Sequence, residues 1–205
     1  MLGNDLVDLG ALAALRHERF DARVFDAAEL DAIAASREPE RLRWSFWAAK
    51  ESAFKALRRL DRSVTFTPLR FAVTPDLASH ERRAWMHVAH GRKGVLVRVE
   101  SEASFLHAVA GSDADAVATT LCAVARADDV APKATPREAV RRLARAGIAN
   151  ALRIDPAELE IVRHGRIPNL AWRGAALPAA LSLSHDGRFV AFACRIAETA
   201  RRSLS

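Results

Sequence analysis

Residues 39–60 read PERLRWSFWAAKESAFKALRRL. Within this stretch, apolar side chains recur at spacings of three and four residues: Leu42, Phe46, Ala49, Ala53 and Leu57. That spacing places them on one face of a helix. The stretch therefore predicts a long helix that buries one side against the rest of the fold.

Shorter segments rich in Val, Phe and Trp follow this helix, and Pro, Ser, Gly and Asp separate them. They favour strands over residues 64–73, 84–89, 94–101, 105–110 and 116–125. Residues 127–136 are typical of a linker, after which a second helix is expected to continue to about Leu152. Further strands are expected at 158–163, 168–172 and 181–193. Residues 105–110 and 189–193 resemble each other, and this single match needs support before it indicates a duplication.

The composition suits one globular unit, or two small halves that share a core. The chain has 205 residues, 50% of them hydrophobic and 27% charged. It has no run of eighteen apolar residues, which argues against a membrane-spanning helix. Asp5 and Asp8 stand where a secretory signal would carry basic and then apolar residues, which argues against such a signal. Cys122 and Cys194 are far apart in apolar surroundings, which favours free thiols and a cytoplasmic protein.

The net charge of +6 is distributed unevenly. Residues 1–125 hold 17 basic and 17 acidic residues, whereas residues 126–205 hold 14 basic and 8 acidic ones. A basic half indicates an anionic partner: nucleic acid, a membrane surface, a phosphorylated ligand or an acidic protein. The preference for Arg over Lys is also typical of a GC-rich coding sequence, so charge alone leaves the partner open.

Three places in the sequence carry groups capable of chemistry. Lys50 and Lys55 flank Glu51 on the long helix, and a carboxylate between two amines suits a metal–phosphate complex. An ordinary surface ion pair is the alternative. Asp5, followed by Asp8, lies in an expected apolar strand. A carboxylate there is costly without a partner, so we expect Asp5 either to bind a cation or to cap a neighbouring element.

Ser184 and His185 follow an expected strand and precede a turn. This pair would expose an imidazole at a sheet edge, or it is simply part of the turn. No Gly-x-Ser-x-Gly elbow, P-loop, dinucleotide fingerprint, zinc spacing or calcium loop occurs.

Together these segments resemble the 4′-phosphopantetheinyl transferase superfamily. They occur in the order used by bacterial holo-acyl-carrier-protein synthases: G-x-D at residues 3–5, W-x-x-K-E-S-x-x-K at 47–55 and S-H at 184–185. Residues 19–29 are similar to that family's R-F…R…E segment. The central motif is specific to the family. The other motifs are weak evidence alone, but their order along the chain makes them strong evidence together.

The chain also departs from those synthases, which are much shorter. The larger surfactin-type members are two fused half-units, and this chain resembles them with the halves in swapped order. The resemblance thus implies an α+β fold of two similar half-units, residues 1–125 and 126–205. Each would be a small antiparallel sheet packed on a long helix, and the active site would lie in the seam. Val7 stands where surfactin-type members have a third acidic metal ligand.

The resemblance implies transfer of 4′-phosphopantetheine from coenzyme A to a serine of an apo carrier protein. Asp5 and Glu51 would hold Mg²⁺, and Lys50 and Lys55 would hold phosphate oxygens. Lys55 would also protonate the leaving adenosine 3′,5′-bisphosphate, and Glu51 would activate the acceptor serine. The phosphates of coenzyme A would contact a set drawn from the basic half: Ser184, His185 and Arg166. Asp8 would lie behind the metal ligands.

Carrier proteins are generally acidic, so three arginines are expected to dock the carrier: Arg16, Arg19 and Arg23. The chain is expected to be a monomer that binds neither nucleic acid nor membranes.

The alternative to a transferase is a basic nucleic-acid-binding domain that uses Arg141, Arg142 and Arg145, although no known nucleic-acid-binding motif appears.

Overall fold

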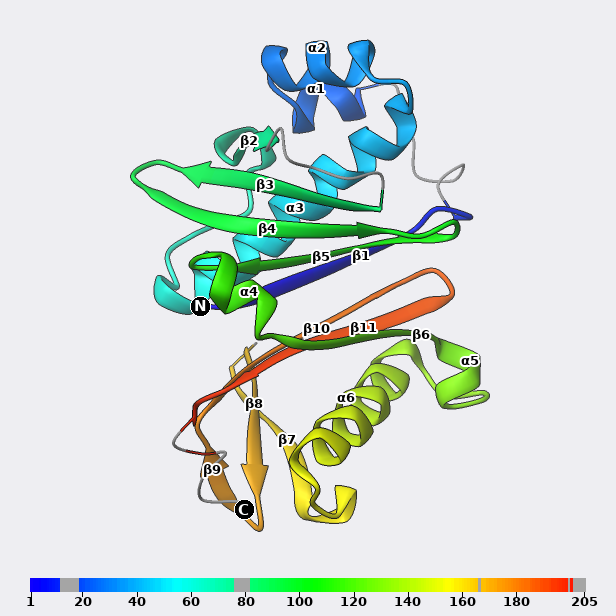
Figure 1. Ribbon diagram of the computed structural model, residues 1–205, viewed down its shortest axis with the longest axis vertical. Coiled ribbons are helices and arrows are strands. Elements are labelled where there is room, and N and C mark those ends of the chain that lie inside the picture. The colour runs from blue at the N-terminus through cyan, green and yellow to red at the C-terminus, as the bar shows by residue number, and fades with distance from the viewer. Residues whose placement is uncertain (12–18, 76–81, 166, 199, 201–205) are drawn as a thin grey trace.

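A computed structural model describes residues 1–11, 19–75, 82–165, 167–198 and 200. Its first layer is an antiparallel sheet in the order β1-β5-β4-β3-β2 (Figure 1). The strands are β1 (Gly3–Asp8), β2 (Ala72–Pro75), β3 (Arg83–His90), β4 (Lys93–Ser101) and β5 (Phe105–Gly111). The long helix α3 (Pro39–Leu60) packs against this sheet, and α1 (Phe20–Val24) and α2 (Ala27–Ala35) lie beside its N-terminal part.

The predicted helix over residues 39–60 is confirmed, and small residues explain how closely it approaches the sheet. Pro39 occupies its first turn, where a missing N–H costs nothing. Ala49, Ala53 and Ala56 are fully buried. A Cβ on Gly3 would overlap the carbonyl oxygen of Ser52, so only glycine lets β1 run this close to α3. β1 is therefore pressed against the helix face that carries the central motif.

The second layer is a three-stranded antiparallel sheet in the order β10-β11-β6. Its strands are β6 (Leu121–Arg126), β10 (Ala179–Asp186) and β11 (Phe189–Ile196). Helix α6 (Pro136–Leu152) packs on it through Ala144, Ile148 and Ala149. A small sheet completes this end of the molecule: β7 (Leu159–His164), β8 (Ile167–Trp172) and β9 (Ala175–Leu177). Short helices join the larger elements: the 3₁₀ helices η2 (Pro68–Arg70) and η3 (Pro156–Glu158) and the α-helices α4 (Ala114–Ala118) and α5 (Ala127–Val130).

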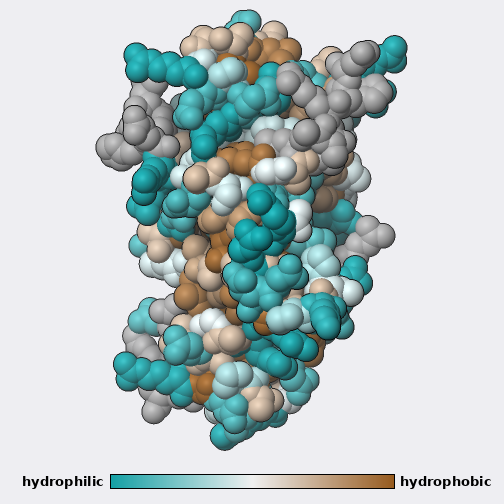
Figure 2. All heavy atoms as spheres, turned by 90° about the vertical axis from the view of Figure 1, so that its right-hand side faces the viewer, coloured by the Kyte–Doolittle hydropathy of each residue, from teal (hydrophilic) through white to brown (hydrophobic). Residues whose placement is uncertain are grey.

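The two layers meet where β1 and β5 lie beside β10 and β11 (Figure 1). Leu6 of β1 packs with Phe189 and Ala191 of β11 in this interface. The rings of Phe105 and Phe189 lie 5.1 Å apart. On the face in Figure 2, hydrophobic side chains reach the surface at the end that carries α1 and α2 and again along the middle, between hydrophilic regions. No helix within the described residues is long and apolar enough to cross a membrane.

Several predicted elements differ from the observed ones. Residues 64–71 do not form a strand, because Pro68 begins a 3₁₀ turn and pairing with β3 starts only at Ala72. The segment 116–125 begins inside α4, whose first turn is capped by Asp113. The run 181–193 is a hairpin, since Gly187 adopts φ 47° and turns the chain. The expected linker contains α5, and α6 then starts at Pro136 behind a Thr135–Glu138 capping box.

The fold is thus mixed α/β with antiparallel sheets, while the division into two similar half-units remains a prediction. The expected boundary at residue 125 falls inside β6. β6 pairs with β11 rather than with the first sheet, so the change of sheet comes before Leu121.

Candidate active site

A pocket of about 330 Å³ lies in the seam between the two layers. Strand β1 contributes Asp5, Leu6 and Val7, and β10 contributes Leu183, Ser184, His185 and Asp186. Helix α3 contributes Trp44, Trp47, Glu51 and Lys55, whose spacing of three and four residues places them on one face. Three segments that are distant in the sequence therefore meet in one pocket.

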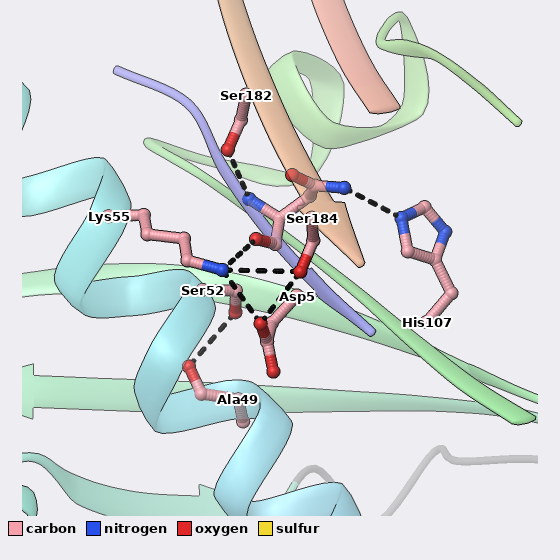
Figure 3. A network of polar contacts seen from close by, with 8 residues as sticks. Asp5, Ala49, Ser52, Lys55, His107, Ser182 and Ser184 are labelled. Carbon is pink, nitrogen blue, oxygen red and sulfur yellow. Dashed lines mark hydrogen bonds and ion pairs between the residues drawn. The ribbon is translucent and has the colours of Figure 1, made fainter. Parts of the chain in front are cut away.

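Lys55 is the centre of a polar network in this pocket (Figure 3). Its Nζ donates to Asp5 Oδ1 at 2.7 Å, to the carbonyl oxygen of Asn4 at 3.0 Å and to Ser184 Oγ at 3.3 Å. Ser184 Oγ donates to the same Asp5 oxygen at 3.0 Å. Asp5 is only 6% exposed, and a buried carboxylate needs hydrogen-bond partners. Lys55 and Ser184 supply them. The network connects α3, β1 and β10.

The pocket holds more negative than positive charge. Burial, together with the nearby charge of Asp5, raises the pKa of Glu51 to about 7, against the opposing effect of Lys55. Burial and the charges of Asp5 and Asp8 also raise the pKa of Asp186. Like charges that crowd in this way favour a bound cation, and carboxylate oxygens are ligands that Mg²⁺ prefers. Within the described part of the chain, no three acidic, His or Cys side chains are grouped closely enough to hold a metal by themselves.

The raised pKa of Glu51 predicts a pH-dependent loss of stability in the metal-free protein. A carboxyl with a higher pKa in the folded state stabilises the fold while it is protonated, and this contribution is lost as the pH rises from about 4.5 to about 7. One pKa unit corresponds to about 1.4 kcal/mol, so Glu51→Gln should unfold with a free energy about 3–4 kcal/mol higher than wild type at pH 8. Urea unfolding in EDTA at pH 4 and pH 8 measures this difference. An equal difference at both pH values would contradict the assignment.

Lys50 does not contact the pocket, and the expectation that it binds phosphate is wrong. It is fully buried, and its Nζ donates to Glu29 Oε2 at 2.7 Å and to the carbonyl oxygens of Val24 and Pro68. Glu29 also accepts from the backbone N–H of Val73 at 2.8 Å. Burial lowers the pKa of Lys50, and the contacts with Glu29 oppose that shift. This pair connects α2, α3 and β2 inside the core.

We therefore expect Lys50→Met to affect folding rather than ligand binding. Removing one partner of a buried ion pair leaves the other charge unpaired and costs about 3–5 kcal/mol of unfolding free energy. Urea unfolding measures this loss. Lys93→Met, which removes the lysine of the solvent-exposed ion pair with Asp61, is the control and should be far milder. A Lys50→Met protein with wild-type stability would refute the structural role.

A second groove, of about 400 Å³, adjoins the first pocket. Lys55, Leu183 and His185 line both. None of the described residues that line this groove is a carboxylate, and its basic side chains come from four elements: Lys55, Arg58 and Arg59 of α3, Arg137 and Arg141 of α6, Arg163 of β7 and His185 of β10. Burial and the charges of Arg163 and Arg137 lower the pKa of Arg141. Such mutual repulsion is relieved by a bound polyanion.

The other expected site residues have mixed outcomes. His185 is exposed and Ser184 is buried, and both line the seam pocket. Arg166 and Arg16 lie outside the described residues. Arg19 and Arg23 are exposed at α1. Asp8 is fully buried, pairs with Arg188 and is not itself among the residues that line the pocket.

Sequence reasoning missed Asp186, Trp44 and the arginine groove. Asp186 directly follows the S-H motif, and Trp44 lies one turn before Trp47 on α3, so helical spacing from Glu51 would have found the tryptophan. The groove arginines carry no such signal, because they converge only after folding.

The fold and site define a mixed α/β protein whose carboxylate pocket, with one lysine, adjoins an arginine groove. Residues 1–119, more than half of the chain, match the family model of the 4′-phosphopantetheinyl transferase superfamily. The chain belongs to this superfamily.

A similar curated protein is a holo-[acyl-carrier-protein] synthase from Rhodopirellula baltica (strain DSM 10527 / NCIMB 13988 / SH1). It is 36% identical over 78 residues, which cover 37% of this chain and 62% of that relative. No solved structure matches this chain.

Proposed function

We propose that this protein transfers the 4′-phosphopantetheine group of coenzyme A to a serine of an apo acyl or peptidyl carrier protein. The observation that carries the proposal is the junction of the acidic seam pocket with the arginine groove through Lys55 and His185. Coenzyme A has a 3′-phosphate at one end, a pyrophosphate in the middle and a neutral arm at the other end. That order of charges fits a cationic groove that leads into a catalytic pocket.

In this arrangement the 3′-phosphate of coenzyme A lies among Arg137, Arg141 and Arg163, and the pyrophosphate lies at the junction near Lys55 and His185. The pantetheine arm then extends past Glu51 toward Trp44 and Trp47. Trp44 is 3% exposed, and its indole N–H has no hydrogen-bond partner among the described residues. A buried donor without a partner is costly, which supports an acceptor from the arm at this point.

The residues of the pocket fit a magnesium ion. Asp5 and Glu51 would hold it, because their carboxylates share the pocket and the high pKa of Glu51 reflects charge that a cation would neutralise. When bound, Mg²⁺ would neutralise negative charge on the pyrophosphate oxygens.

The chemical step transfers one phosphoryl centre and moves two protons. The serine oxygen forms a bond to the phosphorus that carries the pantetheine arm, and the bond from that phosphorus to the bridging oxygen of the pyrophosphate breaks. Glu51 accepts the proton of the serine hydroxyl. Lys55 donates a proton to the departing adenosine 3′,5′-bisphosphate, from an ammonium that Asp5 Oδ1 holds at 2.7 Å.

The carrier protein is the second substrate in this proposal. Arg19 and Arg23 are exposed on α1, which suits an acidic partner. Arg16 belongs to the same expected docking set. A cytoplasmic monomer that contains both half-units in swapped order completes the proposal.

The release of adenosine 3′,5′-bisphosphate tests this function. Chromatography of a reaction with coenzyme A, Mg²⁺ and an apo carrier should detect it in amounts equal to the modified carrier. An apo carrier whose acceptor serine is changed to alanine is the control and should yield none. Release without the carrier would instead indicate hydrolysis of coenzyme A and would contradict the proposal.

A further inference from the structure

The seam contains an ion pair to which the proposed chemistry gives no role. Asp8 is the last residue of β1 and is fully buried. Arg188 lies in the turn that joins β10 to β11, and its side chain is 47% exposed. Asp8 Oδ2 accepts from the backbone N–H of Arg188 at 2.9 Å and from its Nε at 2.8 Å. Asp8 Oδ1 accepts from Arg188 Nη2 at 2.5 Å and from the N–H of Gly10 at 2.9 Å. The Arg188 guanidinium holds the pKa of Asp8 well below its usual range, so the pair is charged.

The backbone of Asp8 also contacts the active site. Its N–H donates to Asp186 Oδ2 at 2.7 Å, and Asp186 lines the pocket together with Asp5 and Glu51. Between Asp186 and Arg188, Gly187 has φ 47°, and a Cβ there would overlap the Asp8 carboxylate. The turn of residues 186–188 is therefore bonded to Asp8 at both ends: Asp186 accepts from its backbone N–H, and Arg188 donates to its carboxylate.

These contacts are significant because β1 and β10 belong to different sheets. No backbone ladder sets the position of one strand along the other. Side chains do so instead: the N–H of Asn4 donates to Ser182 Oγ at 3.0 Å, and Ser184 Oγ donates to Asp5 Oδ1 at 3.0 Å. The Asp8–Arg188 pair is the charged member of this series, and it lies at the end of the seam next to His185 and Asp186.

We propose that the Asp8–Arg188 ion pair positions His185 and Asp186 in the active site. The inference rests on the proposed function, since it concerns how the coenzyme A site is held together. Asp8 and Arg188 act as positioning residues through the turn of residues 186–188. A misplacement of about 1 Å can cost about 100-fold in rate, so a smaller shift of His185 and Asp186 is expected to weaken the contacts with coenzyme A several-fold.

The test compares Asp8→Asn with Glu158→Gln. Glu158 also pairs with an arginine, Arg173, at 2.8 Å and accepts from Trp172 Nε1, but it lies outside both pockets. Calorimetric titration with coenzyme A, well below each melting temperature, should give a dissociation constant about five- to tenfold higher for Asp8→Asn. Glu158→Gln should bind as wild type does. Arg188→Gln should show the same loss and Arg188→Lys a smaller one, and these variants of a half-exposed residue serve if Asp8→Asn does not fold.

A second readout does not depend on ligand binding. The NMR signal of the His185 imidazole, assigned with His185→Gln, should shift in Asp8→Asn and in Arg188→Gln but not in Glu158→Gln. A lower melting temperature with an unchanged coenzyme A dissociation constant and an unchanged His185 signal would reduce the pair to a stabilising role and overturn the inference. Failure of the wild type to bind coenzyme A would refute the proposed function, and the His185 signal would then decide the positioning role by itself.

Discussion

Glu51→Gln is expected to abolish most phosphopantetheine transfer, with kcat falling by about 10²–10⁴-fold. The amide is nearly isosteric with the carboxylate, but it neither accepts a proton at neutral pH nor binds a divalent cation well. Glu51 faces the pocket with Asp5 and Lys55, so its loss affects the reacting centre rather than the packing of α3. Intact-mass spectrometry of the carrier over time gives the rate.

The same substitution should raise the stability of the metal-free protein, because the buried carboxylate is destabilising when it is charged, so its two effects have opposite signs. This combination separates a catalytic role from a structural one. A charged group is retained at a site where it destabilises the fold when it serves function. A Glu51→Gln protein that turned over at the wild-type rate would contradict the proposed chemistry.

The second large effect is expected from the arginine groove. Arg137→Glu combined with Arg163→Glu should raise the KM for coenzyme A by about 100-fold or more, because hydrogen bonds to charged groups contribute about 1.5–3 kcal/mol each. Both side chains are exposed, and no hydrogen bond from either to the described residues is observed, so the fold should tolerate the change. Initial rates at varied coenzyme A concentration, with the carrier saturating, measure this effect.

Arg37→Glu is the control, because it makes the same change of charge at an exposed arginine that precedes the first turn of α3, at the opposite end of that helix from Arg58 and Arg59 and outside the groove. Its KM should stay within about twofold of wild type, since exposed charges are screened beyond about 8–10 Å. The double variant should also lose the preference for coenzyme A over its form that lacks the 3′-phosphate. Equal KM values for the double variant and the control would show that the groove does not bind the phosphates.

Much of the scaffold was predictable from local patterns. The spacing of apolar residues predicted α3 with its observed bounds, and the capping residues before Pro136 mark the start of α6. The ordered motifs predicted that β1, α3 and β10 would supply one site, and the structure brings Asp5, Glu51, Lys55 and Ser184 together. Short elements were predicted less well, because turn chemistry at Pro68 and Asp113 outweighs β propensity there.

The error at Lys50 has a geometric cause. Adjacent residues on a helix are turned about 100° from each other, so Lys50 cannot share the face of Glu51, whereas Lys55 does. Its partner Glu29 stands out in the sequence only as the end of the segment that is similar to the family's R-F…R…E pattern. No local pattern indicates that Glu29 and Lys50 meet in the fold. The arginine groove is a product of tertiary structure, since α3, α6 and β7 each contribute cations.

The intact mass of an apo acyl carrier protein most directly tests the central claim. The carrier is incubated with this protein, coenzyme A and Mg²⁺, beside a reaction with Glu51→Ala and one with EDTA. The account predicts a mass gain equal to one phosphopantetheine group in the complete reaction and none in the two controls. No gain with fatty-acid, polyketide and peptide-synthetase carriers alike, together with no shift of the melting temperature by coenzyme A, would contradict it.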